Sequence, residues 1–488
     1  MVILTPGHEV TWAVPTKEAY SLGLSIKRTA VIAGAGAGCA MVAWKVWKSA
    51  ALTRNNRSIA PNQKIVIVGA GFAGLNVAQE LSNLLPAENG GQITLVDQNN
   101  YLLFTPMLTE VAGGELDPHH ILAPPRLLSP RINFEQGRVH DIDLGNKAVV
   151  FDVVDDGSSR RTLKADHIVI ALGSVPNFHG IPGVQEHSFG LKSIGDAAAI
   201  RNRILEALEH ASWEQDSAVR KELLTLVVGG GGYTGVETMA AVNDLVRTSL
   251  KHYPKISPGE VRTVIVEPGD RLMSELSPDL AAFGQQKLEE RGVEVRLKTK
   301  ITRATANFVE LENGERIRTR MLIWAGGITP NPLIGSLSCK RGEHGGVVVD
   351  ECCAVPDHPG VWALGDCAEV PKPDAKGTYA PTAQNATREG TLVARNIVAV
   401  LRGRRSEPFQ FTPVGELALV GRHSGVGKIY GHRFSGLLAW AMWRVVYISK
   451  TPGMAQRSRI ALDWVLDFIF GRNIAELPVD RSVAAPRQ

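Results

Sequence analysis

The chain has 488 residues, 44% hydrophobic and 21% charged, which is enough for roughly two to four globular domains with ample cores. Its net charge of +4 is unevenly distributed, because residues 1–63 carry +5, residues 421–488 carry +6, and the middle carries −7. An acidic body with basic ends excludes a typical nucleic-acid-binding protein and favours attachment to a surface. The five cysteines show no CxxC pair and no metal-ligand spacing, so we predict no metal site and a reducing compartment.

The predicted N-terminal extension, residues 1–63, contains a weakly apolar run rich in Ala and Gly at residues 29–47. Lys45 interrupts this run, and basic residues flank it. About 20 apolar residues span a bilayer, so one interpretation is a single transmembrane anchor, whose basic flank would place the body in the cytoplasm. A targeting or dispensable extension is the alternative, and the sequence leaves both open.

A dinucleotide-binding pattern follows the extension. Ile65–Val68 predict a strand buried on both faces, and Gly69, Gly71 and Gly74 form the turn into a helix. The first glycine permits the tight turn, the second lets a pyrophosphate approach the backbone, and the third lets the helix pack close to the strand. The next strand ends in Asp97, 23 residues after Gly74, close to the roughly 20 expected for a carboxylate that binds ribose.

The segment after the first unit predicts mixed short elements. Residues 98–120 are rich in Gly, Pro and aromatic residues, and we expect a loop and helix that lie along a cofactor. Residues 138–170 alternate like short antiparallel strands and end in a buried strand before Gly173. A small residue at Gly173 would let the backbone approach a cofactor, and a plain turn is an equal alternative. Residues 196–224 predict one polar helix.

The opening pattern then returns with a buried strand and a turn that contains Gly230, Gly232 and Gly235. Chance duplication of the whole strand–turn–helix pattern is improbable, so we predict a second dinucleotide site. The following strand ends in Glu267. A carboxylate there accepts hydrogen bonds from both ribose hydroxyls and repels a 2′-phosphate, which favours NADH over NADPH, although the nearby Arg271 weakens this preference.

The second unit closes as the first does. Residues 300–327 predict short strands, and Gly326 follows the last of them as Gly173 does in the first unit. Downstream, a buried strand leads into a Gly-Asp pair that contains Asp366, and residues 382–401 have the pattern of a helix.

Two amphipathic helices are predicted near the C-terminus, at residues 436–448 and 455–470. The first has 13 residues and an internal arginine, so it is too short to span a bilayer. In the second, Ile460, Trp464 and Phe468 form an apolar stripe. The predicted charged side consists of Arg459, Asp463 and Asp467. We expect both helices to lie in a membrane interface with Trp side chains as anchors, and two core helices are the alternative.

Taken together, these motifs resemble the flavoproteins with two dinucleotide-binding domains. The resemblance implies an α/β fold with two Rossmann-like domains, of which the first binds FAD non-covalently and the second binds NADH, plus a C-terminal amphipathic helical segment that binds membrane. The expected boundaries are 64–185 with 328–410 for the FAD domain, 186–327 for the NADH domain, 411–475 for the membrane-association segment, and 476–488 for a tail.

Within this group the chain resembles the type II NADH dehydrogenases, which are non-pumping NADH:quinone oxidoreductases. Residues 99–116, NNYLLFTPMLTEVAGGEL, resemble the family's segment after the first acid, and residues 231–237, GGYTGVE, resemble its nucleotide loop. Residues 382–390, TAQNATREG, resemble its quinone-site signature AQxAxQxG. The chain departs from this signature at Arg388, where the common residue is Gln, and this puts the detail of the quinone pocket in question.

The resemblance also assigns roles to individual residues. Glu237 occupies the position of a carboxylate near the quinone and flavin, where it would relay a proton, and Gln384 would hydrogen-bond a quinone carbonyl beside Arg388. For Glu237 the alternative is a carboxylate that only complements a helix dipole, and for Gln384 it is a helix-start residue that faces solvent. The implied FAD-binding residues are Gly69, Gly71, Gly74, Asp97, Gly173, Asp366 and Ala383. The implied NADH-binding residues are Gly230, Gly232, Gly235, Glu267 and Gly326.

The expected activity is hydride transfer from NADH to FAD followed by transfer of two electrons to a quinone. The first step needs alignment and exclusion of water rather than an acid–base side chain. We expect the enzyme at the cytoplasmic face of a bacterial inner membrane, with an organellar inner membrane as the alternative. Its expected partners are the quinone and the lipid surface, without nucleic acid, and the sequence leaves open whether it forms a homodimer.

Other functions fit the sequence less well. A disulfide reductase needs a cysteine pair near the first helix, and no cysteine lies between Gly74 and Cys339. A sulfide:quinone reductase needs no nicotinamide site, and a ferredoxin or rubredoxin reductase needs no membrane-binding C-terminus. A redox-sensing flavoprotein similar to apoptosis-inducing factors would keep both nucleotide sites but turn over slowly with quinones.

Overall fold

The computed structural model of the chain describes residues 63–86, 92–153, 159–373, 377–412 and 415–477. The apolar run at residues 29–47 and most of the predicted tail lie outside the described residues. All described residues belong to one compact unit. Within that part of the chain, no helix combines the length and the apolar character needed to cross a bilayer.

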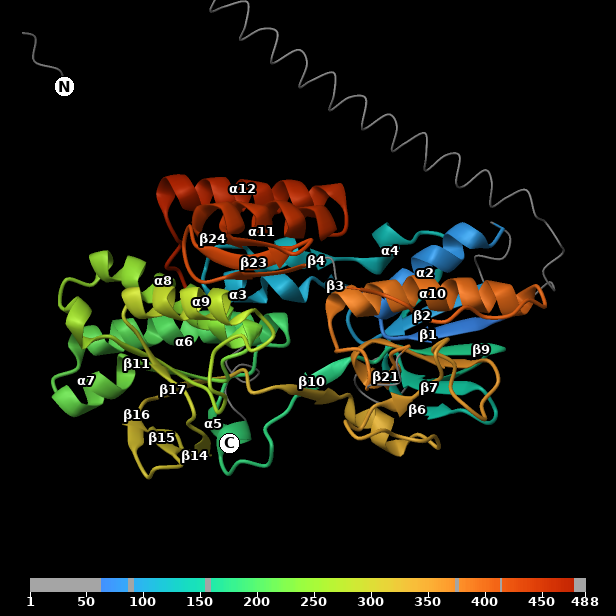
Figure 1. The fold of residues 1–488 in the computed structure, drawn as a ribbon, viewed down its shortest axis with the longest axis horizontal. Coiled ribbons are helices and arrows are strands. Elements are labelled where there is room, and N and C mark those ends of the chain that lie inside the picture. Colours follow the sequence, from blue (N-terminus) through green and yellow to red (C-terminus); the bar gives the residue numbers. More distant parts are fainter. Residues whose placement is uncertain (1–62, 87–91, 154–158, 374–376, 413–414, 478–488) are drawn as a thin grey trace, which may run out of the picture. The chain divides into compact units, whose positions relative to one another are not determined.

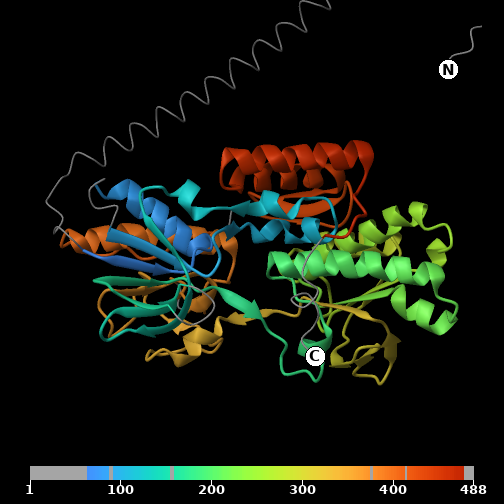
Figure 2. The same ribbon diagram turned by 180° about the vertical axis from the view of Figure 1, so that it is seen from behind.

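A parallel five-stranded sheet forms from the apolar runs of the first predicted unit, with the strand order β20-β9-β1-β2-β5. Every residue of β1 and β9 is buried, as expected for strands that are covered on both faces. Helices α2 and α10 cover one face, and a small antiparallel sheet lies on the other (Figures 1 and 2). The five strands are β1 (Ile65–Val68), β2 (Ile93–Asp97), β5 (Asn133–Gln136), β9 (His167–Ile170) and β20 (Val361–Ala363).

Helix α10 (Ala383–Leu401) closes the first unit from a distant part of the sequence, because it packs directly against α2 (Phe72–Leu84). A Cβ added at Gly390 would lie only 2.6 Å from the backbone oxygen of Ala73. The predicted helix over 382–401 is confirmed, with Thr382 as its N-cap, since the Thr382 side chain accepts a hydrogen bond from the backbone N–H of Asn385.

Short antiparallel strands follow each dinucleotide unit, as predicted for residues 138–170 and 300–327. The ribbon of β10 and β18 links the two units, because β10 leaves the first unit and pairs with β18, which returns from the second. The strands of the first set are β6 (Arg138–Asp143), β7 (Ala148–Asp152) and β8 (Arg160–Lys164). The second set consists of β14 (Ile301–Ala304), β15 (Phe308–Leu311) and β16 (Arg316–Arg318), and the ribbon of β10 (Ser174–Pro176) and β18 (Ile328–Pro330).

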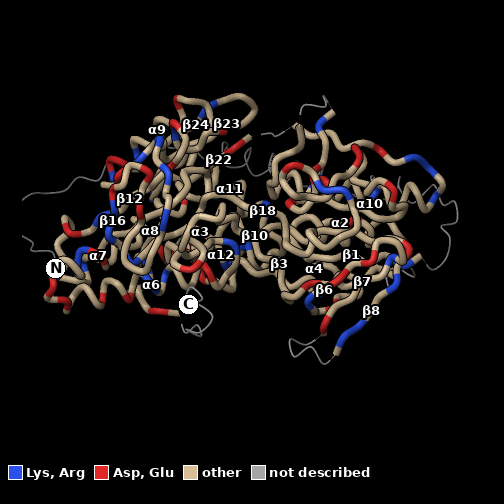
Figure 3. Tube along the Cα trace, turned by 90° about the horizontal axis from the view of Figure 1, so that it is seen from below, with Lys and Arg blue, Asp and Glu red and all other residues tan. Residues whose placement is uncertain are grey.

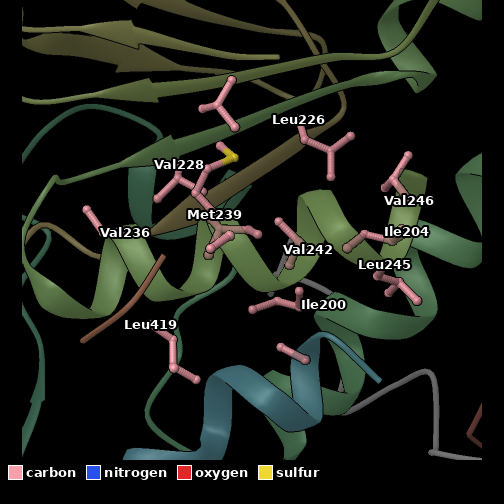
Figure 4. Packing of buried hydrophobic residues seen from close by; sticks show 14 of the residues in the cluster. Ile200, Ile204, Leu226, Val228, Val236, Met239, Val242, Leu245, Val246 and Leu419 are labelled. Atoms are coloured by element: carbon pink, nitrogen blue, oxygen red, sulfur yellow. The ribbon is translucent and has the colours of Figure 1, made fainter. Parts of the chain in front are cut away.

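The second unit contains a parallel sheet with the strand order β13-β12-β11-β17. Its strands are β11 (Thr225–Gly229), β12 (Arg262–Val266), β13 (Val293–Arg296) and β17 (Met321–Trp324), and its helices are α6 (Ile194–Trp213), α7 (Ser217–Leu223), α8 (Tyr233–Ser249) and α9 (Pro278–Glu290). Figure 4 shows side chains of β11, α6 and α8 meeting in one apolar core, among them Val228, Ile204 and Met239. Leu419 of the C-terminal region reaches the same core, so that region packs on the second unit as part of one cluster.

The prediction of one helix over residues 196–224 was wrong, because α6 ends at Trp213 and α7 begins at Ser217. Glu214 has extended backbone angles. The Asp216 side chain accepts hydrogen bonds from the N–H groups of Ala218 and Val219, which makes it the N-cap of a new helix. Local capping therefore interrupts a polar periodicity that continues across the break.

The C-terminal region consists of an antiparallel sheet and two helices that lie over α3 and α8 (Figure 1). The residues before α3 form short elements, in agreement with the predicted loop and helix over 98–120. The C-terminal elements are β22 (Gly415–Leu419), β23 (Gly425–Ile429), β24 (His432–Ser435), α11 (Gly436–Lys450) and α12 (Met454–Phe470). Around residues 98–123 lie β3 (Leu102–Leu103), α3 (Leu108–Ala112) and β4 (Leu122–Ala123), with 3₁₀ turns at Thr105–Met107 and Pro118–Ile121.

Charged residues of both signs are spread along the described chain. In Figure 3, segments of Lys and Arg alternate with segments of Asp and Glu over both parallel-sheet units.

Candidate functional site

The first glycine turn connects β1 to α2 and has three glycines with different surroundings. Gly69 has a φ of +104°, and a Cβ on it would lie 2.2 Å from the oxygen of Ala171. A Cβ on Gly74 would lie 1.9 Å from the oxygen of Gly69, whereas nothing lies within 4 Å of one on Gly71. The outer two glycines therefore permit the turn and the close packing of α2, while the middle one faces open space beside the N-terminus of a helix.

Asp97 closes the same turn from the end of β2. Its Oδ2 accepts a hydrogen bond from the N–H of Ala70 at 2.6 Å, and its Oδ1 accepts one from Asn99 at 2.7 Å. Burial raises the pKa of the Asp97 carboxyl, and these two hydrogen bonds lower it. The predicted ribose-binding acid thus lies directly beside the glycine turn.

The second glycine turn, between β11 and α8, repeats this geometry. Gly230 has a φ of +109°, and a Cβ on it would meet the oxygen of Ala325 at 2.4 Å. A Cβ on Gly235 would lie 1.8 Å from the oxygen of Gly230, and again nothing lies within 4 Å of one on Gly232. Glu267 accepts hydrogen bonds of 2.6 Å from the N–H groups of Gly231 and Gly269, in the position that Asp97 has in the first unit.

The predicted glycines at the strand ends occupy two different environments. Gly173, after β9, has a φ of +67° and open space around it. At Gly326, after β17, an added Cβ would lie 2.4 Å from the indole ring of Trp324. The oxygen of Gly326 accepts a hydrogen bond from Nε2 of His179 at 2.8 Å. Of the two glycines, Gly173 therefore has open space where a side chain would lie, whereas Gly326 is covered by Trp324.

Asp366 lies just after β20 and belongs to a small polar network. Its Oδ2 accepts a hydrogen bond of 2.6 Å from the Ser174 hydroxyl and lies 3.3 Å from Nζ of Lys192. The preceding residue, Gly365, donates its N–H to Oε2 of Glu389 at 2.7 Å. Burial raises the pKa of Glu389 to about 7.

Sequence reasoning missed three members of this network, namely Ser174, Lys192 and Glu389. Ser174 and Lys192 are far from Asp366 in sequence, and no local pattern marks them. Glu389 lies inside the quoted motif TAQNATREG, so its position in that motif was a signal that could have identified it.

The first unit fits a bound dinucleotide. In a parallel sheet all carboxyl ends meet at one edge, so the residues that follow β1, β2, β9 and β20 share one edge. That edge carries two carboxylates, Asp97 and Asp366, together with open backbone at Gly71 and Gly173. Such a set can hold ribose or ribityl hydroxyls and a pyrophosphate, as FAD requires.

Glu237 is half-buried on α8, one turn beyond the second glycine turn. Its Oε1 accepts a hydrogen bond of 2.9 Å from the N–H of Leu419, so it is bound to the C-terminal region and not to the start of its own helix. Burial raises the pKa of Glu237 to about 7, while the hydrogen bond from Leu419 and the adjacent indole N–H of Trp443 lower it. At neutral pH, the protonated and the ionised form of a carboxyl with such a pKa are present in comparable amounts.

The residues of the predicted quinone signature lie at the start of α10. The amide Nε2 of the half-buried Gln384 donates to the oxygen of Gly415 at 3.4 Å. Arg388 is exposed, and its guanidinium carbon lies 4.2 Å from the centroid of the Phe411 ring. Partial desolvation lowers the pKa of Lys450 at the end of α11, and the charge of Arg388 lowers it further. The signature therefore faces the C-terminal helices.

An aromatic row joins the first glycine turn to the surroundings of Glu237. Phe72, the first residue of α2, has its ring centroid 5.7 Å from that of Phe104. Phe104 lies 6.5 Å from Tyr447, and Tyr447 stacks on Trp443 at 4.3 Å. Sequence analysis missed this row, because its members come from three distant segments.

The predicted orientation of α12 was only partly right. Ile460 is fully buried and Trp464 packs on the core, whereas Phe468, the third residue of the predicted apolar stripe, is exposed. Asp463 and Asp467 also face the body, where Asp463 pairs with Nδ1 of His120 at 2.6 Å and Asp467 lies 3.5 Å from Nη2 of Arg422. Partners from distant segments, which the helical pattern does not reveal, decided which face is buried.

The predicted role of the C-terminal tryptophans as interfacial anchors was also wrong for Trp443, which is fully buried. Trp440 and Trp464 hold Arg444 between them, with ring centroids 4.5 and 4.4 Å from its guanidinium carbon. Aliphatic residues and phenylalanines instead form an exposed surface, here named the outer apolar face. It consists of Leu437, Leu438, Val445, Met454, Leu462, Val465, Leu466, Phe468, Ile469 and Phe470.

Within the described part of the chain, no group of three or more His, Cys, Asp or Glu side chains is arranged to hold a metal ion. The described cysteines are free thiols. Burial raises the pKa of Cys352 to about 11 and that of Cys367 to about 12, so these thiols are protonated at neutral pH. They lack the thiolate character that a redox-active cysteine needs.

Comparison with known proteins places both regions of the chain in families. Residues 63–390 match the pyridine nucleotide-disulphide oxidoreductase family, and residues 414–473 match the NDH2 C-terminal domain. A solved structure of NDH2 from Plasmodium falciparum in complex with NADH has the same fold, with a TM-score of 0.79 and 21% sequence identity over 85% of this chain and 100% of that chain.

Two relatives align over most of their length. The type II NADH:quinone oxidoreductase Ndh of Mycobacterium tuberculosis is 30% identical over 424 residues, which cover 84% of this chain and 89% of the relative. A probable NADH dehydrogenase of Dictyostelium discoideum is 29% identical over 435 residues, which cover 88% and 94% respectively. The chain therefore belongs to the pyridine nucleotide-disulphide oxidoreductase family and, within it, to the type II NADH:quinone oxidoreductases.

Proposed function

We propose that this chain oxidises NADH and reduces a quinone at a lipid surface, with FAD as a non-covalently bound cofactor. The observation that carries the proposal is the pair of glycine turns, which repeat one nucleotide-binding geometry twice in a single compact unit. The proposed boundaries are 64–185 with 328–410 for the FAD domain, 186–327 for the NADH domain, and 411–475 for the segment that contacts lipid.

In the FAD domain we assign the phosphate contacts to the open backbone at Gly71 and the N-terminus of α2. Asp97 and Asp366 accept hydrogen bonds from hydroxyl groups, Gly173 leaves room for the cofactor, and Ala383 borders it from the start of α10. When bound, FAD supplies the two-electron redox chemistry that connects NADH to the quinone.

In the NADH domain we assign the phosphate contacts to Gly232 and the N-terminus of α8. Gly230 and Gly235 hold the turn and the helix together, and Gly326 brings the end of β17 close to the nucleotide. Glu267 accepts hydrogen bonds from the ribose hydroxyls and repels a 2′-phosphate, which makes NADH the preferred substrate over NADPH.

At the quinone site, Glu237 donates a proton, and Gln384 donates a hydrogen bond to a quinone carbonyl. Reduction of a quinone to a quinol takes up two electrons and two protons, and Glu237 supplies one of those protons. Its pKa of about 7 suits this role, because a proton donor works best when its pKa is close to the working pH. Arg388 adds a charged donor where the signature AQxAxQxG has an amide.

The outer apolar face is our proposed contact with lipid. On α12, Leu462, Val465, Leu466 and Ile469 follow the spacing of one helix face, and all are at least 43% exposed. Lys450 and Arg459 lie exposed on the same two helices, as basic residues do on helices at anionic membrane surfaces. A quinone dissolved in the bilayer would then reach α10 and α11 without crossing water.

For the location we propose the cytoplasmic face of an inner membrane. The relatives include bacterial enzymes and enzymes named as mitochondrial, which fits an inner membrane. The basic ends of this chain favour the side on which positively charged segments are retained.

The redox function is tested by anaerobic titration of the purified protein with NADH, followed by addition of a soluble quinone. We expect NADH to bleach the flavin absorbance and the quinone to restore it. Ferricyanide and sulfide serve as control reactants. A protein that binds no flavin, or whose NADH-reduced flavin is not reoxidised by any quinone, would contradict the proposal.

The lipid contact is tested by flotation with vesicles that contain anionic phospholipid. Leu462→Asp combined with Ile469→Asp should abolish flotation, because both place a charge in the hydrocarbon boundary. Trp213→Ser is the matched control, since Trp213 is 72% exposed but lies at the end of α6 in the NADH domain. Equal flotation of the two variants would locate the lipid contact elsewhere.

A further inference from the structure

A buried group of charged side chains lies between α3, α11, α12 and the segment that follows α12. We name it the Glu110 cluster, and it consists of Glu110, Glu115, Arg444, Asp467 and Arg472. Glu110 and Arg472 are each 2% exposed, and Glu115 is 8% exposed. No part of the redox function assigned above uses these residues.

The two arginines of the cluster lie closer to Glu115 than to Glu110. Nη2 of Arg472 lies 2.9 Å from Glu115, and its Nη1 donates to the backbone oxygens of Gly113 and Ala241. Nη2 of Arg444 lies 3.5 Å from Glu115 and 3.6 Å from Glu110. Neither oxygen of Glu110 accepts a hydrogen bond from a described residue. Glu115 is therefore the ionised member of the pair, and Glu110 is the member that keeps its proton.

The electrostatics of the pair agree with this geometry. Burial raises the pKa of Glu110 well above the usual range, and the negative charge of Glu115 raises it further. The charges of Arg472 and Arg444 outweigh the effect of burial on Glu115 and lower its pKa. A protonated Glu110 can then donate its hydrogen bond to the Glu115 carboxylate.

Unpaired polar atoms gather around the cluster. The described residues contain fifteen buried side-chain nitrogen or oxygen atoms without a hydrogen bond of good geometry, and seven of them are here. They are both oxygens of Glu110, the Nε atoms of Arg444 and Arg472, the indole nitrogens of Trp443 and Trp464, and Oδ1 of Asp467. Buried polar atoms of this kind normally bind ordered water, and a chain of water and carboxyl groups conducts protons.

Glu237 lies on α8, which packs on α3, the helix that carries Glu110. The negative charge of Glu237 also raises the pKa of Glu110 and that of Tyr447. Helices α3 and α8 approach closely, because a Cβ on Gly113 would lie 2.9 Å from Cβ of Ala241. On the other side, the half-buried Asp467 interacts with the charge of Glu115 and lies beside Arg422.

We propose that Glu110 is a buried proton carrier that returns a proton to Glu237 after Glu237 has protonated the reduced quinone. This step rests on the proposed function of Glu237. The O–H bond of Glu110 breaks, an O–H bond forms on Glu237, and Glu110 takes a new proton from solvent on the Asp467 side. The electrons come from NADH, so the step itself is a proton transfer without redox change. Glu110 acts through Glu237 and does not touch the quinone.

Single and multiple turnovers separate this role from a structural one. In Glu110→Gln, the first reoxidation of NADH-reduced protein by quinone should keep the wild-type rate at about pH 6, because Glu237 still holds its proton. Steady-state turnover should fall about tenfold, with the largest loss above about pH 7. In Glu237→Gln, both the first and later turnovers should slow.

Two measurements distinguish the loss of a proton carrier from misfolding of the variant. Flavin content and melting temperature show whether Glu110→Gln folds. Infrared spectra of the oxidised protein at about pH 9, where Glu237 and Glu389 are ionised, should still contain the carbonyl band of a protonated carboxyl, and Glu110→Gln should remove it. If Glu110→Gln loses flavin, Glu110→Asp carries the test, because it keeps a titratable group at a changed distance and should shift the alkaline limb of the rate profile.

Several outcomes would overturn the inference. Wild-type steady-state rates for Glu110→Gln at every pH would exclude the relay, even if Glu237→Gln is slow. An equal loss of single-turnover and steady-state rates in Glu110→Gln would indicate a structural role. Wild-type rates for Glu237→Gln would instead contradict the proposed role of Glu237 itself, and so distinguish the two claims.

Discussion

The two glycine turns have nearly the same backbone geometry, but the chain covers them in different ways. In the first unit, α10 returns from a distant part of the sequence and packs on α2, and Glu389 of α10 binds the N–H of Gly365. In the second unit, the described neighbours of α8 at its start come from β22, through Tyr233 with Glu416 and Glu237 with Leu419. A helix thus closes the first motif, as suits a resident cofactor, and contacts from a strand close the second, as suits a substrate that exchanges.

The largest effects are expected from a methyl group at the middle glycine of each turn. Neither Gly71→Ala nor Gly232→Ala meets an atom within 4 Å, so both variants should fold. Gly71→Ala should purify without flavin, because its methyl group takes the place of a pyrophosphate. Gly232→Ala should keep its flavin and raise the KM for NADH by more than about tenfold, since each 1.4 kcal/mol lost is tenfold.

The measurements are flavin absorbance of the purified proteins and initial rates at varied NADH concentration. The outer glycine Gly69 supplies a control for folding, because Gly69→Ala collides with the backbone of Ala171 and should reduce soluble yield. Retention of flavin by Gly71→Ala together with loss of flavin by Gly232→Ala would reverse the assignment of the two sites.

The next largest effect is expected at Glu237 and is compared with that at Glu389, since burial raises the pKa of both carboxyls to about 7. Glu237 and Glu389 each accept one backbone hydrogen bond. Glu237→Gln should slow quinone reduction by about 10²-fold and leave NADH-driven flavin reduction within about twofold. In the wild type, quinone reduction should slow as the pH rises above about 7, because the proton donor ionises.

Stopped-flow measurement of both half-reactions over a range of pH provides the check. Glu389→Gln is the comparison, because it removes an acid with the same raised pKa that contacts the Gly-Asp turn instead. An identical slowing of quinone reduction in both variants would mean that burial of charge, and not a position at the quinone, causes the effect.

The same pKa shift predicts how Glu237 affects stability. The folded pKa of about 7 lies above the unfolded value near 4.5, so the unfolded chain loses this proton first. The contribution of Glu237 to the free energy of unfolding is fully present below about pH 4.5 and falls by about 3 kcal/mol as the pH rises to about 7. Chemical denaturation at several pH values should show a smaller decline in Glu237→Gln, and an unchanged decline would argue against the raised pKa.

Sequence periodicity predicted the two parallel sheets because buried strands next to glycine turns leave a local signature. The strands at Ile65–Val68 and Thr225–Gly229, the acids that follow their neighbours, and α10 all lie where the pattern placed them. Each of these features depends on residues within about thirty positions of one another, which is the range over which periodicity and turn chemistry act.

The parts that sequence could not predict depend on partners far apart in the chain. The orientation of α12 follows from His120 and Arg422, which bind Asp463 and Asp467 and turn the acids inward. The Asp366 network and the Glu110 cluster also join segments separated by more than 170 residues. A helical pattern distinguishes the two faces of a helix, but it does not predict which face packs on the rest of the protein.

A smaller effect is expected from Glu267→Gln, which tests whether Glu267 makes the second unit prefer NADH over NADPH. The neutral amide still accepts a hydrogen bond from a ribose hydroxyl but no longer repels a 2′-phosphate. The ratio of kcat/KM for NADH to that for NADPH should fall about tenfold, mainly through a lower KM for NADPH. Asp97→Asn is the comparison in the first unit, and it should leave this ratio unchanged while weakening the retention of flavin.

The smallest effect tests whether packing of α10 on α2 retains the cofactor. Gly390→Ala places a methyl group 2.6 Å from the backbone oxygen of Ala73, and backbone cannot move aside as a side chain can. We expect an overpacking cost of about 1–3 kcal/mol, a melting temperature about 2–4 °C lower, and faster loss of flavin on dilution.

Gly284→Ala on α9 is the matched change in the second unit, where the methyl group meets the flexible end of Met273 at 2.5 Å. That variant should melt near the wild type, since repacking of Met273 and the better helix propensity of alanine offset each other. If both variants hold flavin equally well, the packing of α10 on α2 is not what retains the flavin in the first unit.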